Sequence, residues 1–286
     1  MNTYRALPDN LKDYADAAQK YLVRDLGLSA IKVEQEVHRE IDFRPTLSAV
    51  SVDKHIICAE VVEELFAPDI EQFVLSCRNH SLPVKLYVVV RKGQFLAYDQ
   101  KVLKTARENG IAILEVSPPN HGTLITNPPV SLSLGGLRGF NLQSFPPKFR
   151  EPLKQAIETF KSGNPAKGCG DVYDEIEQIT RRIGRKCEGI PGALKKVGVI
   201  DWEKGNWATA LEFLKANLEK GTVACPQLNN QLFSRLIGMT EYRNEAGHKP
   251  SSLQKKIDRD KQLRTRFESA MDELKSLIEA SRPLRI

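Results

Sequence analysis

The feature that most constrains the fold is a change of hydrophobic pattern across residues 117–147, a stretch with six prolines and no regular period. Before this stretch, apolar residues alternate in short runs between helix-like segments, and after it they recur only every three or four positions. Alternation is typical of strands, and recurrence at every third or fourth position is typical of helices. The sequence therefore predicts an α+β protein of two domains, an α/β domain at 1–116 and an all-α domain at 148–286, joined by a linker at 117–147.

The first domain is predicted to run in the order helix, three strands, helix, strand, helix, strand. The predicted helices are 11–27, 69–81 and 101–110, and the predicted strands are 31–40, 46–53, 55–62, 84–93 and 111–117. The segment 84–93, VKLYVVVRKG, is a nearly continuous apolar run. Such a run suits a strand that is covered on both faces.

The second domain shows no convincing strand. Its apolar residues fall at positions i, i+3 and i+4 in five segments, 149–163, 171–187, 206–221, 227–247 and 252–280. This spacing places the apolar side chains on one face of each helix. We therefore expect a bundle of five helices.

The segment EYRNEAGHKP, residues 241–250, places Arg243 five positions before His248 at the end of the fourth of these helices. One interpretation is an ordinary helix end, in which Gly247 ends the helix and the following cations complement its dipole. The other is a ribonuclease site, because histidine titrates near neutral pH and arginine can stabilise charge at phosphorus. On a continuous helix the two side chains would point about 140° apart. Convergence therefore requires the helix to end at Gly247 or a second copy of the site to come close.

An all-helical domain with Arg-Asn-x-x-x-His at the end of its penultimate helix resembles the HEPN superfamily, over about residues 148–286. The resemblance implies a metal-independent endoribonuclease of the kind found in toxin and antiphage systems, acting as a homodimer with a composite site. It gives Arg243 and His248 the catalytic positions and Asn244 the polar position after the arginine. It also implies an acidic residue on an earlier helix, for which Glu175 and Glu177 are both candidates, although each also suits a solvated helix face.

A basic run follows the motif. Residues 255–266, KKIDRDKQLRTR, contain six cations and two acids, and Lys and Arg exceed Asp and Glu by five in residues 151–286 but by only one in residues 1–150. The run is either a wet face of the last helix or a surface that holds RNA phosphates in a salt-sensitive contact. The candidate RNA-binding residues are Lys249, Lys255, Lys256 and Arg259.

The order α-β-β-β-α-β of the first domain resembles the restriction-endonuclease-like fold, the PD-(D/E)xK group. The resemblance implies an acidic residue on the second strand and Glu-x-Lys on the third, which hold Mg²⁺ near the scissile phosphate. Here Thr46 stands in place of the aspartate, Glu60 matches the glutamate, and Val62 stands in place of the lysine. Asp42 is a weak additional metal candidate, as is Glu63, and Glu60 could equally lie on the wet face of its strand. We therefore expect a domain that has lost catalysis and retains binding, sensing or dimer formation, with Mg²⁺ as a cofactor only if it is active.

The remaining features concern the cellular location, the cysteines and the other histidines. No run of about 18 apolar residues is present, and the first ten residues lack the apolar core of a signal peptide, so we expect a cytoplasmic protein that spans no membrane. The cysteines, five in number without CxxC spacing, are expected to be buried thiols. The histidines other than His248, which are His38, His55, His80 and His121, form no sequence cluster.

Three functional hypotheses follow. The first is an endoribonuclease that cuts RNA with Arg243 and His248, with an antitoxin or a regulatory protein as a further partner. The second is a non-catalytic nucleic-acid-binding or scaffold protein. The third is a Mg²⁺-dependent DNA nuclease that uses the first domain.

Overall fold

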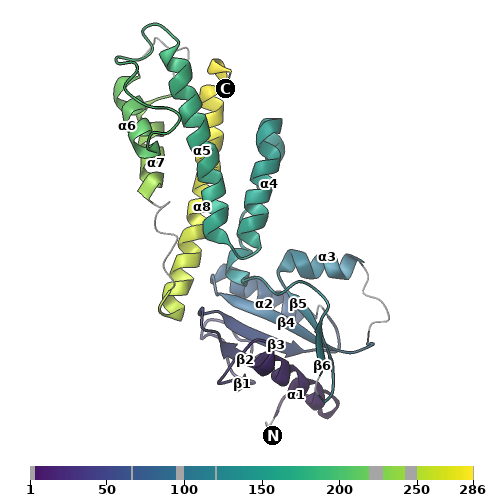
Figure 1. Ribbon diagram of the computed structural model, residues 1–286. Coiled ribbons are helices and arrows are strands. Elements are labelled where there is room, and N and C mark those ends of the chain that lie inside the picture. Colours follow the sequence, from purple (N-terminus) through teal and green to yellow (C-terminus); the bar gives the residue numbers. More distant parts are fainter. Residues whose placement is uncertain are drawn as a thin grey trace. The chain divides into compact units, whose positions relative to one another are not determined.

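The chain is a mixed α+β protein in which a six-stranded sheet precedes a helical region (Figure 1). The computed structural model describes residues 4–65, 67–94, 100–119, 121–218, 228–241 and 250–285. They form two compact units. Unit 1 comprises Met1–Leu137, Lys161–Gly163 and Lys249–Arg264, and unit 2 comprises Arg138–Phe160, Asn164–His248 and Thr265–Ile286.

The sheet of unit 1 has its strands in sequence order. They are β1 (Lys32–Val33), β2 (Leu47–Val50), β3 (Ile56–Val61), β4 (Val84–Arg91), β5 (Ala112–Ser117) and β6 (His121–Leu124). β3, β4 and β5 are mutually parallel, whereas β1, β2 and β6 join by antiparallel pairing. The parallel steps need crossovers, which are made by α2 (Pro68–Asn79) and α3 (Gln100–Asn109).

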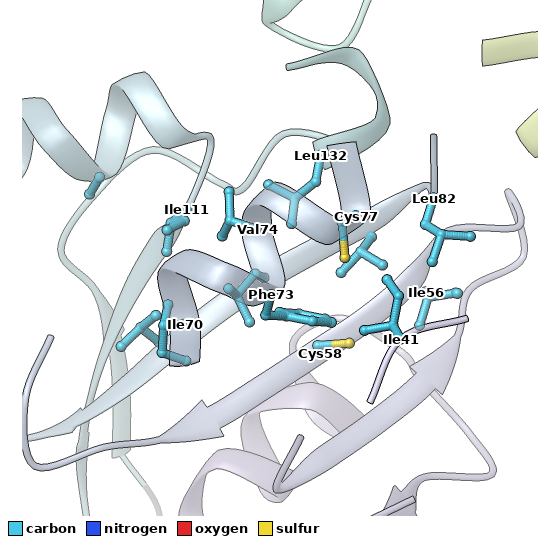
Figure 2. Close-up of a cluster of buried hydrophobic side chains, with 14 of the residues drawn as sticks. Ile41, Ile56, Cys58, Ile70, Phe73, Val74, Cys77, Leu82, Ile111 and Leu132 are labelled. Carbon is cyan, nitrogen blue, oxygen red and sulfur yellow. The ribbon is translucent and has the colours of Figure 1, made fainter. Parts of the chain in front are cut away.

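Helices cover both faces of this sheet (Figure 1). On one face, α2 packs Phe73 and Cys77 against Ile56 and Cys58 of β3, with Leu132 at the edge of the cluster (Figure 2). On the other face, α1 (Asp9–Arg24) packs against a separate cluster. Because alternate residues of a strand point to opposite faces, β3 and β4 must be apolar at nearly every position. The expected burial of 84–93 on both faces is confirmed for β4.

Unit 2 contains the helices α4 (Pro147–Lys161), α5 (Pro165–Glu188), α6 (Trp207–Asn217), α7 (Asn230–Thr240) and the second part of α8 (Leu253–Ser281). Three of these helices begin after an asparagine. Asn164, Asn206 and Asn229 each accept a hydrogen bond from a backbone N–H of the first turn. Such a cap satisfies one of the amides that the helix itself leaves without a partner.

The predicted order of elements is confirmed, but the strand expected at 31–40 is mostly wrong. Pairing stops at Val33 because Glu34 takes a positive φ of 48°. In this conformation the Glu34 carboxylate accepts hydrogen bonds from the backbone amides of Arg5, Ala6 and Leu7. Glu34 thus fixes the approach to α1 instead of extending the sheet.

The stretch 117–147, interpreted as a linker, contains structure of its own. Residues 121–124 form β6 and pair with β5. Two short 3-10 helices follow, η1 (Leu132–Leu134) and η2 (Leu142–Ser144), and Leu132 and Leu134 are fully buried. The prolines flank these pieces, which is where a residue without an amide proton can stand. Within the described residues, no helix has both the length and the apolarity that crossing a membrane requires.

Candidate functional site

The central motif falls in a part of the chain that the structure does not describe. Arg243, Asn244, His248 and Lys249 lie in residues 242–249, outside the described residues. The described part of the preceding helix ends at Glu241, and the description resumes at Pro250, shortly before α8. The predicted helix at 227–247 is confirmed for residues 230–240, whereas the roles of the four motif residues stay predictions.

The two helices that flank the motif in sequence are joined within unit 2. Arg235 of α7 donates from Nε to Oε1 of Glu273 in α8 at 2.5 Å. The Glu273 side chain is only 15% exposed, and its second oxygen has no hydrogen-bond partner among the described residues. α7 also buries Leu236 and Met239 on the approach to the motif. The described end of α7 and the second part of α8 are therefore held in unit 2, whereas the first part of α8, up to Arg264, belongs to unit 1.

The two acidic candidates on α5 differ in their surroundings. Glu177 forms an ion pair with Arg181, which also donates to the backbone oxygens of Trp202 at 3.0 Å and Gly205 at 2.6 Å. This arrangement holds the segment before α6, so Glu177 has a structural role. Burial raises the pKa of Glu175, with help from Asp174, and no hydrogen bond to its side chain is found in the described part of the chain. Glu175 is therefore the better candidate for a proton-transfer group.

The nuclease-like position in the sheet is occupied by an internal hydrogen-bond network. The Glu60 side chain is half-buried, and its Oε2 accepts from the backbone N of Thr46 at 2.6 Å and from Thr46 Oγ1 at 3.0 Å. Thr46 Oγ1 in turn accepts from the amide of Val61 at 3.2 Å. Glu60 thus links β3 to the start of β2, so it is more than a solvated carboxylate on a wet strand face.

Burial raises the pKa of Glu60 to about 7, and the nearby Asp69 and Glu34 add to this effect, while the bonds from Thr46 oppose it. Oε2 of Glu60 is already engaged by Thr46, and a Mg²⁺ site usually needs one or two carboxylates together with substrate phosphate. Asp42 is exposed, and no group of three or more His, Cys, Asp or Glu suited to a metal occurs within the described ranges. The weak metal candidates Asp42 and Glu60 gain no support from these surroundings.

The basic run on α8 is divided between a buried and an exposed face. Lys256 is mostly buried and its Nζ lies 2.8 Å from Oδ1 of Asp260, a fully buried carboxylate. Ser133 donates to the other oxygen of Asp260 at 2.6 Å. Lys256 is thus engaged inside unit 1, whereas Lys255 is exposed and Arg259 is half-buried. RNA contact by these residues and by Lys249 stays a prediction.

No sequence pattern points to the Ser133–Asp260–Lys256 network. Ser133 and Asp260 lie 127 residues apart, and Lys256 and Asp260 have the spacing of ordinary helix-surface charges. The four described cysteines, Cys58, Cys77, Cys169 and Cys187, are buried thiols as expected. Cys225 lies outside the described residues. Burial raises the pKa of Cys77 and of Cys169 to about 12, so neither thiol is poised as a nucleophile.

Two described histidines of unit 1, His55 and His80, have local partners. His55 Nδ1 lies 2.7 Å from Asp53 across the turn between β2 and β3. Burial and the nearby Lys85 and Lys256 lower the pKa of His55. His80 Nδ1 lies 3.0 Å from Glu40. These contacts belong to a turn and to a helix end, and they do not form a second candidate catalytic site among the described residues.

Comparison with known proteins identifies no relative: no family model, no curated protein and no solved structure matches the chain.

Proposed function

We propose that the protein is a metal-independent endoribonuclease in which Arg243 and His248 act on the phosphodiester. The observation that carries the proposal is the placement of Arg243-Asn244-x-x-x-His248 directly after α7, in a unit whose described elements are helices. The arrangement agrees with the resemblance to HEPN ribonucleases. The Arg235–Glu273 bond supports it further, because it ties α7, the helix that leads into the motif, to the second part of α8 within unit 2.

The chemistry assigns a role to each residue. The His248 imidazole moves a proton from the ribose 2′-hydroxyl or to the leaving oxygen, since it titrates near neutral pH. The Arg243 guanidinium donates to the phosphoryl oxygens as negative charge develops there. Asn244 positions the substrate or the neighbouring arginine. Two protomers would each supply this set to a composite cleft, which makes a homodimer the active form.

The sheet unit then serves binding or regulation. Thr46 stands where a metal-binding carboxylate would be needed, and it is hydrogen-bonded to Glu60. An antitoxin or another regulatory protein remains a partner to be sought for this unit. We infer a role of the protein in toxicity or phage defence from the same resemblance.

Metal dependence separates this proposal from a nuclease in the sheet unit. Purified full-length protein is incubated with total RNA and with double-stranded DNA, in EDTA and in Mg²⁺. We expect RNA cleavage that persists in EDTA, is lost in His248→Ala and is retained in Glu60→Ala. Cleavage of either substrate that needs Mg²⁺ and is lost in Glu60→Ala would instead assign catalysis to the sheet. Binding of RNA without cleavage in all conditions would indicate a scaffold.

A further inference from the structure

Two arginines in unit 1 come together beside a pair of glycines. Arg78 lies in the last turn of α2 and Arg264 lies on α8, and Nη1 of Arg264 donates to the backbone oxygen of Arg78 at 3.3 Å. Gly135 and Gly136, directly after η1, lie against these side chains. A Cβ on Gly135 would be 2.7 Å from Nε of Arg78, and a Cβ on Gly136 would be 2.5 Å from Nη1 of Arg264. A side chain at either glycine would therefore require a guanidinium group to shift.

No carboxylate balances this charge. Nη2 of Arg78 donates to the backbone oxygen of Asn109 at 3.2 Å and to its side-chain oxygen at 3.1 Å. Within the described residues, neither Arg78 nor Arg264 forms an ion pair with an acidic side chain. By contrast, the neighbouring Lys256 on α8 is paired with Asp260. The two arginines therefore carry positive charges that only uncharged oxygens contact.

One donor of this pair has no acceptor. Nε of Arg78 is buried and lacks a hydrogen-bond partner among the described residues. A buried donor without an acceptor is costly, so such a group is commonly satisfied by water or by a ligand. Burial also lowers the pKa of Arg78, as expected for a charge that is removed from water without a counter-ion. Both arginine residues remain partly exposed, so an incoming anion can reach them.

We propose that Arg78, Arg264 and the Gly135–Gly136 turn form a binding site for a phosphate group. Guanidinium groups present a fork of donors that matches phosphate oxygens, and the absence of a carboxylate leaves this fork available. The phosphate is either a link of an RNA backbone or a free nucleotide or phosphate ion. The site lies in the sheet unit and is independent of cleavage by Arg243 and His248.

The competing explanation is that both arginines serve only to neutralise helix ends. Arg264 contacts the end of α2, and Arg78 contacts the end of α3. Substitutions that keep the charge but displace the guanidinium group separate the two explanations. Gly136→Ala places a methyl group against Arg264, while Gly139→Ala is the matched control, since nothing lies within 4 Å of its Cβ position.

The test measures binding by full-length protein in EDTA, with inorganic phosphate, AMP and a fluorescein-labelled single-stranded 2′-O-methyl RNA, which lacks the attacking hydroxyl, as probes. We expect Arg264→Gln and Gly136→Ala to weaken binding, and Arg264→Gln to reduce the salt dependence of RNA binding by about one phosphate contact. Gly139→Ala and Lys104→Gln, which removes an exposed cation of α3, should leave binding unchanged. Weaker binding of all three probes indicates a free-phosphate site, and weaker binding of RNA alone indicates a backbone contact.

If these variants fold poorly, a measurement on the wild-type protein still tests the proposal. Phenylglyoxal modifies accessible arginines, and mass spectrometry reports the extent at each position. We expect phosphate or RNA to slow the modification of Arg264. The proposal is overturned if neither ligand protects Arg264, or if folded Arg264→Gln and Gly136→Ala proteins bind every probe as the wild type does.

Discussion

At the scale of single residues, Glu60 makes the stability of the protein depend on pH. Burial raises the pKa of Glu60 to about 7, above the value of about 4.3 expected in the unfolded chain. A group with a raised pKa in the folded state stabilises it fully below the unfolded pKa. This contribution is lost as the pH rises through the folded pKa. We expect the free energy of unfolding contributed by Glu60 to fall by about 2–3 kcal/mol between pH 4.5 and pH 8.

The control is Glu60→Gln, which keeps the shape and a side-chain oxygen for Thr46 but does not titrate. Urea unfolding of both proteins at several pH values gives the difference between them, in which the contributions of other groups cancel. The wild type should lose stability relative to Glu60→Gln as the pH rises. Parallel pH profiles for the two proteins would show that the Glu60 carboxyl titrates normally.

A second residue-scale prediction concerns the glycines of α5. A Cβ on Gly184 would lie 2.3 Å from the six-membered ring of Trp202, whereas a Cβ on Gly170 in the same helix meets nothing within 4 Å. We expect Gly184→Ala to lower the free energy of unfolding by about 1–3 kcal/mol through overpacking. Gly170→Ala should raise it by about 1 kcal/mol, since alanine is the better helix former. Thermal unfolding measures the stability of both variants. Equal changes in stability for Gly184→Ala and Gly170→Ala would contradict the close packing of Trp202 against Gly184.

At the scale of elements, the first part of α8 is held in unit 1 by buried polar groups as well as by Ile257. Asp260 accepts from Ser133 and pairs with Lys256, and Ser133 also contacts Ser131 at 2.8 Å. Asp260→Asn removes the counter-charge of a mostly buried lysine. We expect a loss of about 3–5 kcal/mol in the stability of unit 1. Amide hydrogen exchange should become faster in residues 253–264.

The matched control is Asp258→Asn on the same helix, where the side chain is exposed and accepts only from Gln254. Its effect on unfolding should be within about 0.5 kcal/mol. Comparable losses in the two variants would mean that the Asp260 network contributes little.

The elements show where sequence reasoning succeeds and where it fails. Helices and buried strands were predictable because their apolar pattern continues over eight or more residues, as in α5 and β4. The segment 31–40 also alternates, but Glu34 binds three backbone amides far along the chain, and no local pattern encodes that contact. β6 was missed because four residues between prolines are too few to show a period.

The same limit applies to the candidate sites. The motif Arg243–His248 was found from its spacing, since its members are close in sequence. Arg78 and Arg264 meet across 186 residues, and no local pattern in the sequence points to their contact. The bond between Thr46 and Glu60 required the register of β2 and β3, which the sequence did not supply.

At the scale of the whole molecule, the proposed composite site makes activity depend on dimer formation. In this proposal each protomer would supply one Arg243–His248 pair, so an isolated protomer would lack a complete cleft. We expect RNA cleavage per protomer to rise with protein concentration and to level off when sedimentation shows only dimer. Constant cleavage per protomer in solutions that contain only monomer would contradict the composite site.

The most direct test of the central claim is the chemistry of the RNA ends. Wild-type protein and His248→Ala are incubated with a defined RNA in EDTA, and the new termini are identified by mass spectrometry. Attack by the ribose 2′-hydroxyl predicts 2′,3′-cyclic phosphate and 5′-hydroxyl ends that disappear with His248→Ala. Cleavage by the His248→Ala protein at the wild-type rate, or no cleavage by the wild-type dimer on any RNA, would contradict the account.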